Sequence, residues 1–223
     1  MSSALAARYY LDPMLAFIRG RLQPEGELDA DALYRLGGEA GLRLHKFKRA
    51  TILPRVQRVF GVLRQLWPTD LLDVGSGRGV FLWPLLDTFA DLRVHCLDIR
   101  PDRVSDLQAV HAGGIGRLTT EVADITATAL PDGSYDGVSV LEVLEHLERP
   151  ADAVREAVRL ARRFVIASVP SQPDDNPEHI HLFDGPAPEA MFRAAGIERV
   201  SVDTVLNHIV VLAMVVRRTT PAS

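Results

Sequence analysis

From Asp70 onward the sequence alternates short apolar runs with amphipathic helices, and this alternation constrains the fold more than any other feature. It is typical of a parallel β-sheet covered by helices on both faces. Little more than Asn207 separates the last two β-rich runs, so these are expected to pair antiparallel. The sequence therefore predicts an α/β fold with a doubly wound sheet that is mostly parallel and has an antiparallel C-terminal strand.

The expected elements follow from the spacing of apolar residues. The predicted strands are Leu71–Val74, Arg93–Ile99, Leu118–Ala123, Gly137–Leu141, Phe164–Val169, Glu198–Leu206 and His208–Val216. The predicted helices that accompany them cover about 79–90, 102–112, 150–162 and 186–195.

The first part of the chain has helical spacing only. One helix ends at Pro24-Glu25-Gly26, a second begins near Asp29, and a third runs from Pro54 to about Leu66. At 223 residues the chain can bury one full core and carry a small appendage. We therefore expect a helical cap or lid over residues 1–66 and a core domain over residues 67–218.

Composition narrows the classes of partner and the compartment. The formal net charge is −4, so there is no overall electrostatic attraction to nucleic acid or to a membrane, and neither is expected as a partner. The single cysteine, Cys96, lies in an apolar run and reads as a core residue. Residues 1–20 contain Asp12 and no long apolar stretch, which favours a cytoplasmic protein.

A glycine-rich turn follows the first predicted strand, in the run Leu71-Leu72-Asp73-Val74-Gly75-Ser76-Gly77-Arg78-Gly79. Glycine suits a tight turn that a ligand approaches closely. A dinucleotide site has the spacing Gly-x-Gly-x-x-Gly, but Val80 occupies the third position here and the last glycine comes one residue earlier. This spacing argues against NAD or FAD.

The run Asp73-Val74-Gly75-Ser76-Gly77-Arg78-Gly79 resembles the first motif of the class I S-adenosylmethionine-dependent methyltransferases, whose fold is Rossmann-like. The resemblance implies that Asp73, Gly75, Ser76 and Gly77 line the cofactor. Asp98 follows the last glycine by about 20 residues, the offset at which a carboxylate meets ribose hydroxyls, and Ile99 comes next to it. Asp98 could instead cap the helix that begins near Asp102.

Two later segments resemble further motifs of the same family. Ala123-Asp124-Ile125 and the Leu130–Asp136 stretch resemble the third and fourth motifs, which implies that Asp124 hydrogen-bonds the adenine and Ile125 packs on it; an ordinary loop carboxylate is the alternative for Asp124. The run Leu141-Glu142-Val143-Leu144-Glu145-His146 with Pro150 is very like a Glu-x-Leu-Glu-His-x-x-x-Pro stretch of small-molecule and RNA methyltransferases. It implies that Leu141 and Glu142 lie beside the cofactor.

Two histidines are the candidates for catalysis. Methyl transfer from a sulfonium requires alignment of donor and acceptor and, for many acceptors, removal of a proton. His146 is the first candidate for a base or orienting group, with a structural role in the turn as the alternative. His179 and His181 would point to opposite sides of an extended loop, and we favour His181.

A divalent metal is a separate hypothesis. Glu142, Glu145 and His146 share one face if a helix has begun by then, and a later histidine would complete a two-Glu, two-His ligand set. The small-RNA 3′-terminal 2′-O-methyltransferases and some ubiquinone-pathway O-methyltransferases carry a similar pattern. Because Glu142 has a competing place beside the cofactor, we expect a metal-independent enzyme and leave the metal ligands unassigned.

The sequence therefore predicts an S-adenosylmethionine-dependent methyltransferase acting on an O or N atom of a small metabolite. The alternatives are an RNA 2′-O-methyltransferase with a Glu-x-x-Glu-His metal site and a non-catalytic cofactor-binding relative. The one strongly basic cluster is Leu42–Arg49. From it Arg43 or Lys46 could reach the cofactor's carboxylate, the cluster could meet a phosphate, or it could be a plain solvated helix face. The oligomeric state is left open.

Overall fold

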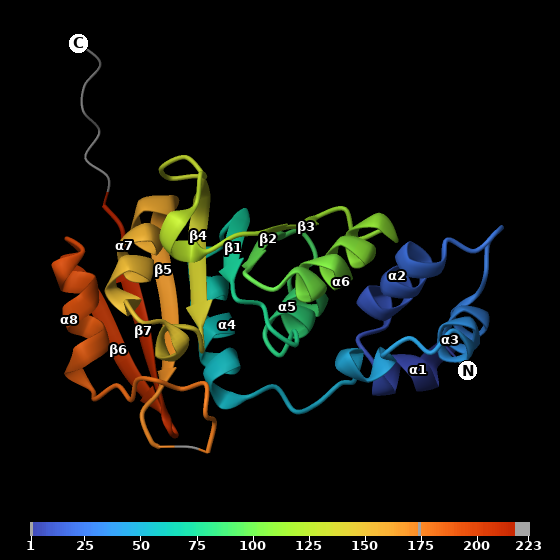
Figure 1. Cartoon of the computed structure of the whole chain (residues 1–223), viewed down its shortest axis with the longest axis horizontal. Coiled ribbons are helices and arrows are strands. Elements are labelled where there is room, and N and C mark those ends of the chain that lie inside the picture. Colours follow the sequence, from blue (N-terminus) through green and yellow to red (C-terminus); the bar gives the residue numbers. More distant parts are fainter. Residues whose placement is uncertain (1, 174, 217–223) are drawn as a thin grey trace, which may run out of the picture. The chain divides into compact units, whose positions relative to one another are not determined.

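A computed structural model describes residues 2–173 and 175–216 and divides into two compact units (Figure 1). Unit 1 comprises the described residues of Met1–Leu53 together with Ser76–Val122. Unit 2 comprises Pro54–Gly75 and the described residues from Ala123 onward. The last two residues of the predicted core domain, 217 and 218, lie outside the described residues.

Unit 1 combines helices with two parallel strands. β2 and β3 pair from Val94 with Leu118 to Asp98 with Val122. The elements of unit 1 are α1 (Ser2–Arg8), α2 (Leu11–Leu22), α3 (Ala30–Glu39), η1 (Leu44–Phe47), α5 (Leu82–Thr88), β2 (Arg93–Asp98), α6 (Pro101–Ala112) and β3 (Leu118–Val122).

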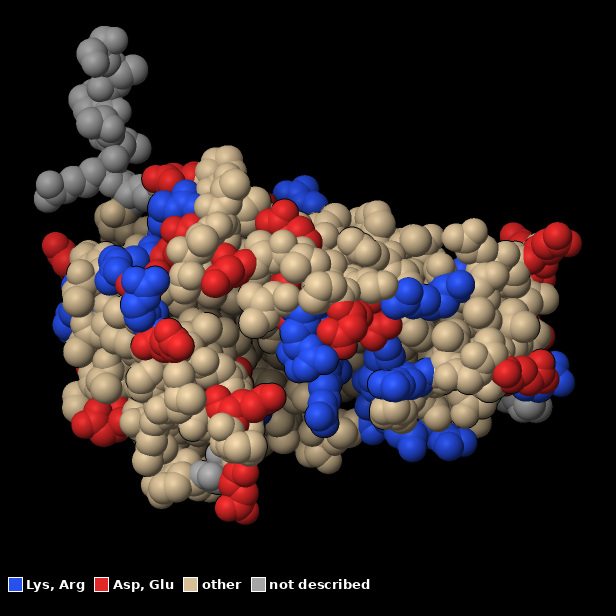
Figure 2. Space-filling view, in the orientation of Figure 1, with Lys and Arg blue, Asp and Glu red and all other residues tan. Residues whose placement is uncertain are grey.

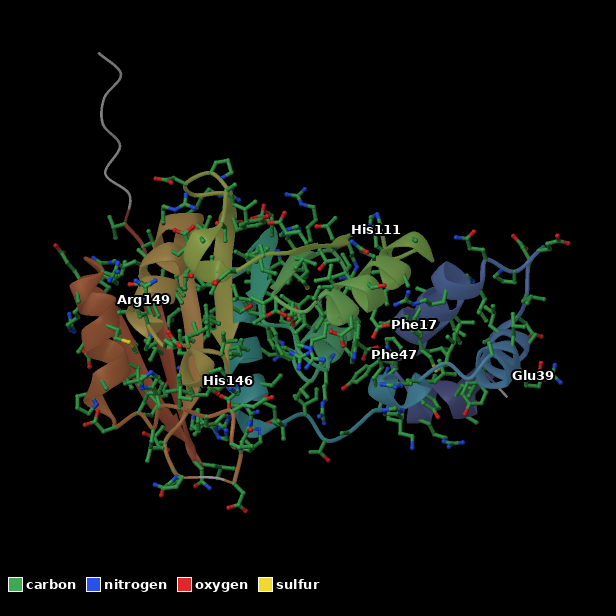
Figure 3. All side chains as sticks on the ribbon, viewed as in Figure 1. Phe17, Glu39, Phe47, His111, His146 and Arg149 are labelled. Atoms are coloured by element: carbon green, nitrogen blue, oxygen red, sulfur yellow. The ribbon has the colours of Figure 1, made fainter. Side chains whose placement is uncertain are left out.

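The crossing of α2 and α6 depends on glycine. A methyl group on Gly20 would lie 1.9 Å from the carbonyl oxygen of Ala109, and one on Gly113 would lie 1.7 Å from that of Ala16. The backbones of the two helices therefore approach more closely than any side chain at these positions allows. Beside this crossing the rings of Phe17 and Phe47 lie 5.3 Å apart, centroid to centroid (Figure 3).

Unit 2 is built on five strands in the order β1-β4-β5-β7-β6. β1, β4 and β5 are parallel to one another, whereas β7 is antiparallel to both β5 and β6. The elements of unit 2 are α4 (Pro54–Leu66), β1 (Asp70–Val74), η2 (Ile125–Ala127), β4 (Tyr135–Leu141), η3 (Leu144–His146), α7 (Pro150–Leu160), β5 (Ala161–Pro170), α8 (Pro186–Ala194), β6 (Arg199–Val205) and β7 (His208–Met214).

The predicted strands and the antiparallel C-terminal pair are confirmed, and α4 has the predicted bounds. The helix expected from 79 begins only at Leu82. Gly77 and Gly79 have φ angles of 57° and 80°, so the chain turns through left-handed backbone before the helix can begin. Cys96 is buried, as predicted. Within the described part of the chain, no helix combines the length and the apolar character that a membrane crossing requires.

We predict that Gly20→Ala destabilises the protein by about 1–3 kcal/mol, because the new methyl group collides with the backbone of α6. The matched control is Gly38→Ala in α3, where an added Cβ meets no atom within 4 Å. That variant should be unchanged or more stable by at most about 1 kcal/mol, because alanine is the better helix former. Urea unfolding measures both, and equal midpoints would contradict the close crossing.

Candidate functional site

In unit 1 the carboxylate of Asp98 lies against the glycine turn. Asp98 ends β2, is only 4% exposed, and accepts hydrogen bonds from the backbone N–H of Gly77 (3.4 Å) and of Arg100 (3.0 Å). A guanidinium nitrogen of Arg103 is 3.5 Å away. Because Arg100 directly precedes α6, Asp98 also fixes the start of that helix. Both sequence interpretations of Asp98, ligand partner and helix start, are therefore compatible with this geometry.

The residues beside this carboxylate are suited to a ligand. Ile99 follows Asp98 and is 65% exposed, an unusual exposure for a large apolar side chain next to a buried strand. In the glycine turn, the hydroxyl oxygen of Ser76 is shielded from solvent and has no hydrogen-bond partner among the described residues. A buried hydroxyl of this kind can accept or donate to a bound polar group.

In unit 2 the strand that leads into the turn contains a buried acid. Asp73 is 2% exposed, and its Oδ1 accepts a hydrogen bond from the hydroxyl of Ser139 at 2.9 Å. The pairing of β1 with β4 places these two residues opposite each other. Gly75 follows with a φ angle of 68°, and a Cβ there would lie 2.6 Å from Cγ2 of Val143. Only glycine fits this position without a shift of its neighbour.

Asp124 and Ile125 stand at the start of η2. One oxygen of Asp124 accepts hydrogen bonds from the N–H and the hydroxyl of Thr126, each at 2.8 Å, so the side chain caps this short helix. Ile125 is 3% exposed. Asp124 thus has a structural role as the cap of η2, which the sequence analysis did not predict. Their predicted contact with adenine stays a prediction.

Glu142 follows Leu141 at the end of β4, in a strained conformation and among three polar partners. Its φ angle is 56°, which non-glycine residues rarely adopt. Its carboxylate accepts a hydrogen bond from the Ser168 hydroxyl at 2.7 Å and lies 3.2 Å from Nε2 of His208 and 3.6 Å from Nε of Arg55. These three partners were missed in the sequence. Of the three, only Ser168 could have been singled out in the sequence, because it is a hydroxyl residue inside an apolar strand.

The second cluster joins η3 to the loop after β5 (Figure 3). Glu145 is fully buried, and a carboxylate oxygen lies 4.0 Å from Nε2 of His179. The rings of His146 and His179 meet edge to face at 4.7 Å. Nδ1 of His146 is 2.9 Å from the carbonyl oxygen of Glu178. The loop is fixed here because the N–H groups of Ile180 and His181 both donate to the Glu145 carbonyl oxygen.

The membership of this cluster differs from the predicted ligand set. Ligand atoms of Glu145, His146 and His179 lie within 4.8 Å of one another. Glu142 is not among them, because η3 is a short 3-10 helix, α7 begins only at Pro150, and no α-helical face joins the three predicted residues. The ring of His181 instead packs 5.9 Å from that of Phe183.

A glycine turn after a buried strand, with an acid at the end of the next strand along the chain, defines an α/β domain of the nucleotide-cofactor-binding class. Residues 72–165 match the family described as "Methyltransferase domain". This match confirms the predicted resemblance to the class I S-adenosylmethionine-dependent methyltransferases over that segment.

Individual relatives agree with this assignment. A ubiquinone biosynthesis O-methyltransferase of Pectobacterium carotovorum is 28% identical over 120 residues, which are 54% of this chain and 47% of that protein. Ajmaline N-methyltransferase of Rauvolfia serpentina is 30% identical over 96 residues, 42% of this chain and 33% of that protein. The chain thus spans less than half the length of these relatives.

Solved structures confirm the Rossmann-like fold. A SAM-dependent methyltransferase from Aquifex aeolicus superposes with a TM-score of 0.59 at 20% identity, covering 73% of this chain and 97% of the other. An O-methyltransferase family protein from Burkholderia thailandensis gives a TM-score of 0.56 at 15% identity, covering 72% and 57%.

The geometry at Gly75 gives a test by paired substitution. Gly75→Ala should destabilise the protein by about 2 kcal/mol, because alanine must adopt a left-handed φ and displace Val143. In the double variant Gly75→Ala, Val143→Ala the collision is removed, so the loss should be smaller than the sum of the two single losses. Gly116→Ala, which meets no atom within 4 Å, is the control. Strict additivity in thermal unfolding would refute the contact.

Proposed function

We propose that this protein transfers the methyl group of S-adenosylmethionine to an O or N atom of a small molecule. The observation that carries the proposal is the contact between the glycine turn and the buried carboxylate of Asp98, within a chain that contains a methyltransferase domain. The relatives named above, an O- and an N-methyltransferase of small molecules, support the same kind of acceptor.

Each portion of the cofactor has a suitable partner among the residues described above. We assign the ribose hydroxyls to Asp98 and the adenine to Ile99, whose exposed side chain offers an apolar face, with Asp124 and Ile125 as further adenine contacts. The shielded Ser76 hydroxyl is suited to a polar atom of the methionine portion. We place five further residues beside that portion: Asp73, Gly75, Gly77, Leu141 and Glu142.

The chemistry left to this chain is alignment and proton removal, since the sulfonium supplies an already activated leaving group. If Nδ1 of His146 carries the hydrogen and donates it to the Glu178 carbonyl, Nε2 keeps a free lone pair. That tautomer is the one a general base requires. We therefore propose His146 as the base or orienting group, with His181 as the second candidate. The acceptor is proposed to be a small metabolite in the cytoplasm, with neither nucleic acid nor a membrane as partner.

Asp98→Ala should weaken the binding of S-adenosylhomocysteine by about 10- to 100-fold, the scale of an unmade charge-assisted hydrogen bond. Asp102→Ala is the matched control, because that exposed acid pairs with Arg100 at the surface of α6. Isothermal calorimetry measures both. The proposal fails if the wild-type protein binds neither S-adenosylmethionine nor its product, or binds NAD tightly instead.

A second candidate, a metal-assisted enzyme, is favoured by one observation. Glu145, His146 and His179 offer one carboxylate and two imidazoles within 4.8 Å, a mixed donor set suited to Zn²⁺ or Mn²⁺. In this reading Nε2 of His146 holds the cation and is not the base. The cation would polarise the acceptor oxygen and lower its pKa.

The metal hypothesis and the base hypothesis predict different effects of substituting neighbouring histidines. A metal site predicts that His179→Ala weakens Mn²⁺ or Zn²⁺ binding at least about tenfold, while His181→Ala, outside the cluster, leaves it nearly unchanged. EDTA should then abolish turnover. Base catalysis predicts a rate loss of roughly 10²–10⁴ for His146→Ala with no response to EDTA. Calorimetry with each metal salt and turnover assays with and without chelator decide between them.

A further inference from the structure

We propose that a pocket in unit 1 binds the anionic end of the methyl acceptor, and that the acceptor is a small acid, a carboxylate or phosphate, built on a single ring. This inference rests on the proposed function, because it concerns the acceptor. The pocket has a volume of about 280 Å³. It is lined by Tyr10, Lys46, Lys48, Ala50, Thr51, Ile52, Leu53, Arg78, Gly79, Val80 and Trp83.

The positive charge of the pocket comes from Lys48 and Arg78. Both side chains are exposed, and neither forms an ion pair with another described residue. Neighbouring cations have carboxylate partners: Lys46 shares Asp106 with Arg21, and Arg49 forms two hydrogen bonds with Asp87, each 2.8 Å long. Figure 2 shows lysine and arginine side chains gathered over η1 and α1 on the face in view. Lys48 and Arg78 are therefore the side chains available to pair with an anionic group of a ligand.

The wall of the pocket is apolar and aromatic. Trp83 and Tyr10 are 4% and 5% exposed, so their rings are held firmly. The indole N–H of Trp83 donates to the carbonyl oxygen of Arg78 at 3.2 Å, which ties the ring to the turn that carries the cation. Burial raises the pKa of the Tyr10 hydroxyl, so the phenol stays neutral and does not offset the positive charge. Such a wall packs against a flat ring.

The volume and the lining of the pocket indicate the class of ligand that it can bind. Pockets for small molecules run from about 300 to 1,000 Å³, so this volume, at the lower end of that range, suits a group of about one ring. Apolar walls with a few placed charges are the usual composition of such sites. Of the glycine turn, only Arg78 and Gly79 line the pocket. Gly75, Ser76 and Gly77, the residues assigned to the cofactor, do not. We therefore assign it to the acceptor and not to the cofactor's own carboxylate.

The test uses Trp83 as a reporter. The chain has two tryptophans, and Trp67 is 75% exposed in unit 2, so Trp67→Phe leaves Trp83 as the single tryptophan. In this background we titrate benzoate, phenyl phosphate and, as a neutral probe of similar size, benzyl alcohol. Saturable changes in Trp83 fluorescence are expected with both anions. The alcohol should bind at least about tenfold more weakly, the loss of roughly one charged contact.

Substitutions locate the charge. Lys48→Ala and Arg78→Ala should each raise the Kd of both anions about tenfold. Arg35→Ala removes the same charge from an exposed position on α3 outside the pocket and should change the Kd less than about twofold. Circular dichroism confirms that each variant is folded. Equal binding of the anions and the alcohol, no saturable response, or equal effects of the three substitutions overturns the proposal.

Saturating S-adenosylhomocysteine separates the two sources of an anionic group. If the pocket holds the acceptor, benzoate and phenyl phosphate keep their Kd when the cofactor product is bound. Competition between them would assign the pocket to the cofactor's carboxylate and overturn the inference. Calorimetry of S-adenosylhomocysteine alone tests the proposed function separately, and the anion titrations without it remain interpretable if that binding fails.

Discussion

The site depends on a buried carboxylate held by backbone N–H groups of the glycine turn and of the segment before α6. Burying an ionised acid is costly unless it is hydrogen-bonded or paired. Asp98 has the N–H groups of Gly77 and Arg100 and the guanidinium of Arg103 for this purpose. Gly77, which donates one of these N–H groups, has a positive φ, as has Gly79, and α5 begins only after this left-handed backbone. The motif spacing, the local backbone and the proposed ribose contact are thus consequences of one constraint.

In unit 2 two acids are hydrogen-bonded by side chains. Its strands β1, β4 and β5 are mostly buried, so each buried polar residue within them needs a partner. Ser139 donates to Asp73 between neighbouring strands, and Ser168 donates to Glu142 at the end of β4. These contacts orient the two acids that we place beside the cofactor. The strained φ of Glu142 is stabilised by the same hydrogen bond and by His208 and Arg55, which supports a functional role for its position.

The spacing of apolar residues along the chain was enough to predict the strands, the antiparallel C-terminal pair and the bounds of α4, because each of these depends on nearby residues. It could not predict the group Glu145, His146 and His179, since its third member depends on the path of a loop fixed by N–H groups that donate to the Glu145 carbonyl. The expected helical face is absent because Glu142 has a left-handed φ, η3 is a short 3-10 helix and α7 begins only at Pro150. The predicted division into a cap and a core stays a prediction; residues 2–53 pack within unit 1, whereas α4 packs within unit 2.

The most direct test of the central claim is a crystal structure of the full chain with S-adenosylhomocysteine. Our account predicts that both ribose hydroxyls lie within about 2.5–3.2 Å of the Asp98 carboxylate oxygens. It also predicts that the adenine lies on Ile99 and that the amino-acid portion meets the turn from Gly75 to Gly77. A nucleoside bound away from Asp98, or a turn whose backbone N–H groups face no part of the ligand, would contradict it.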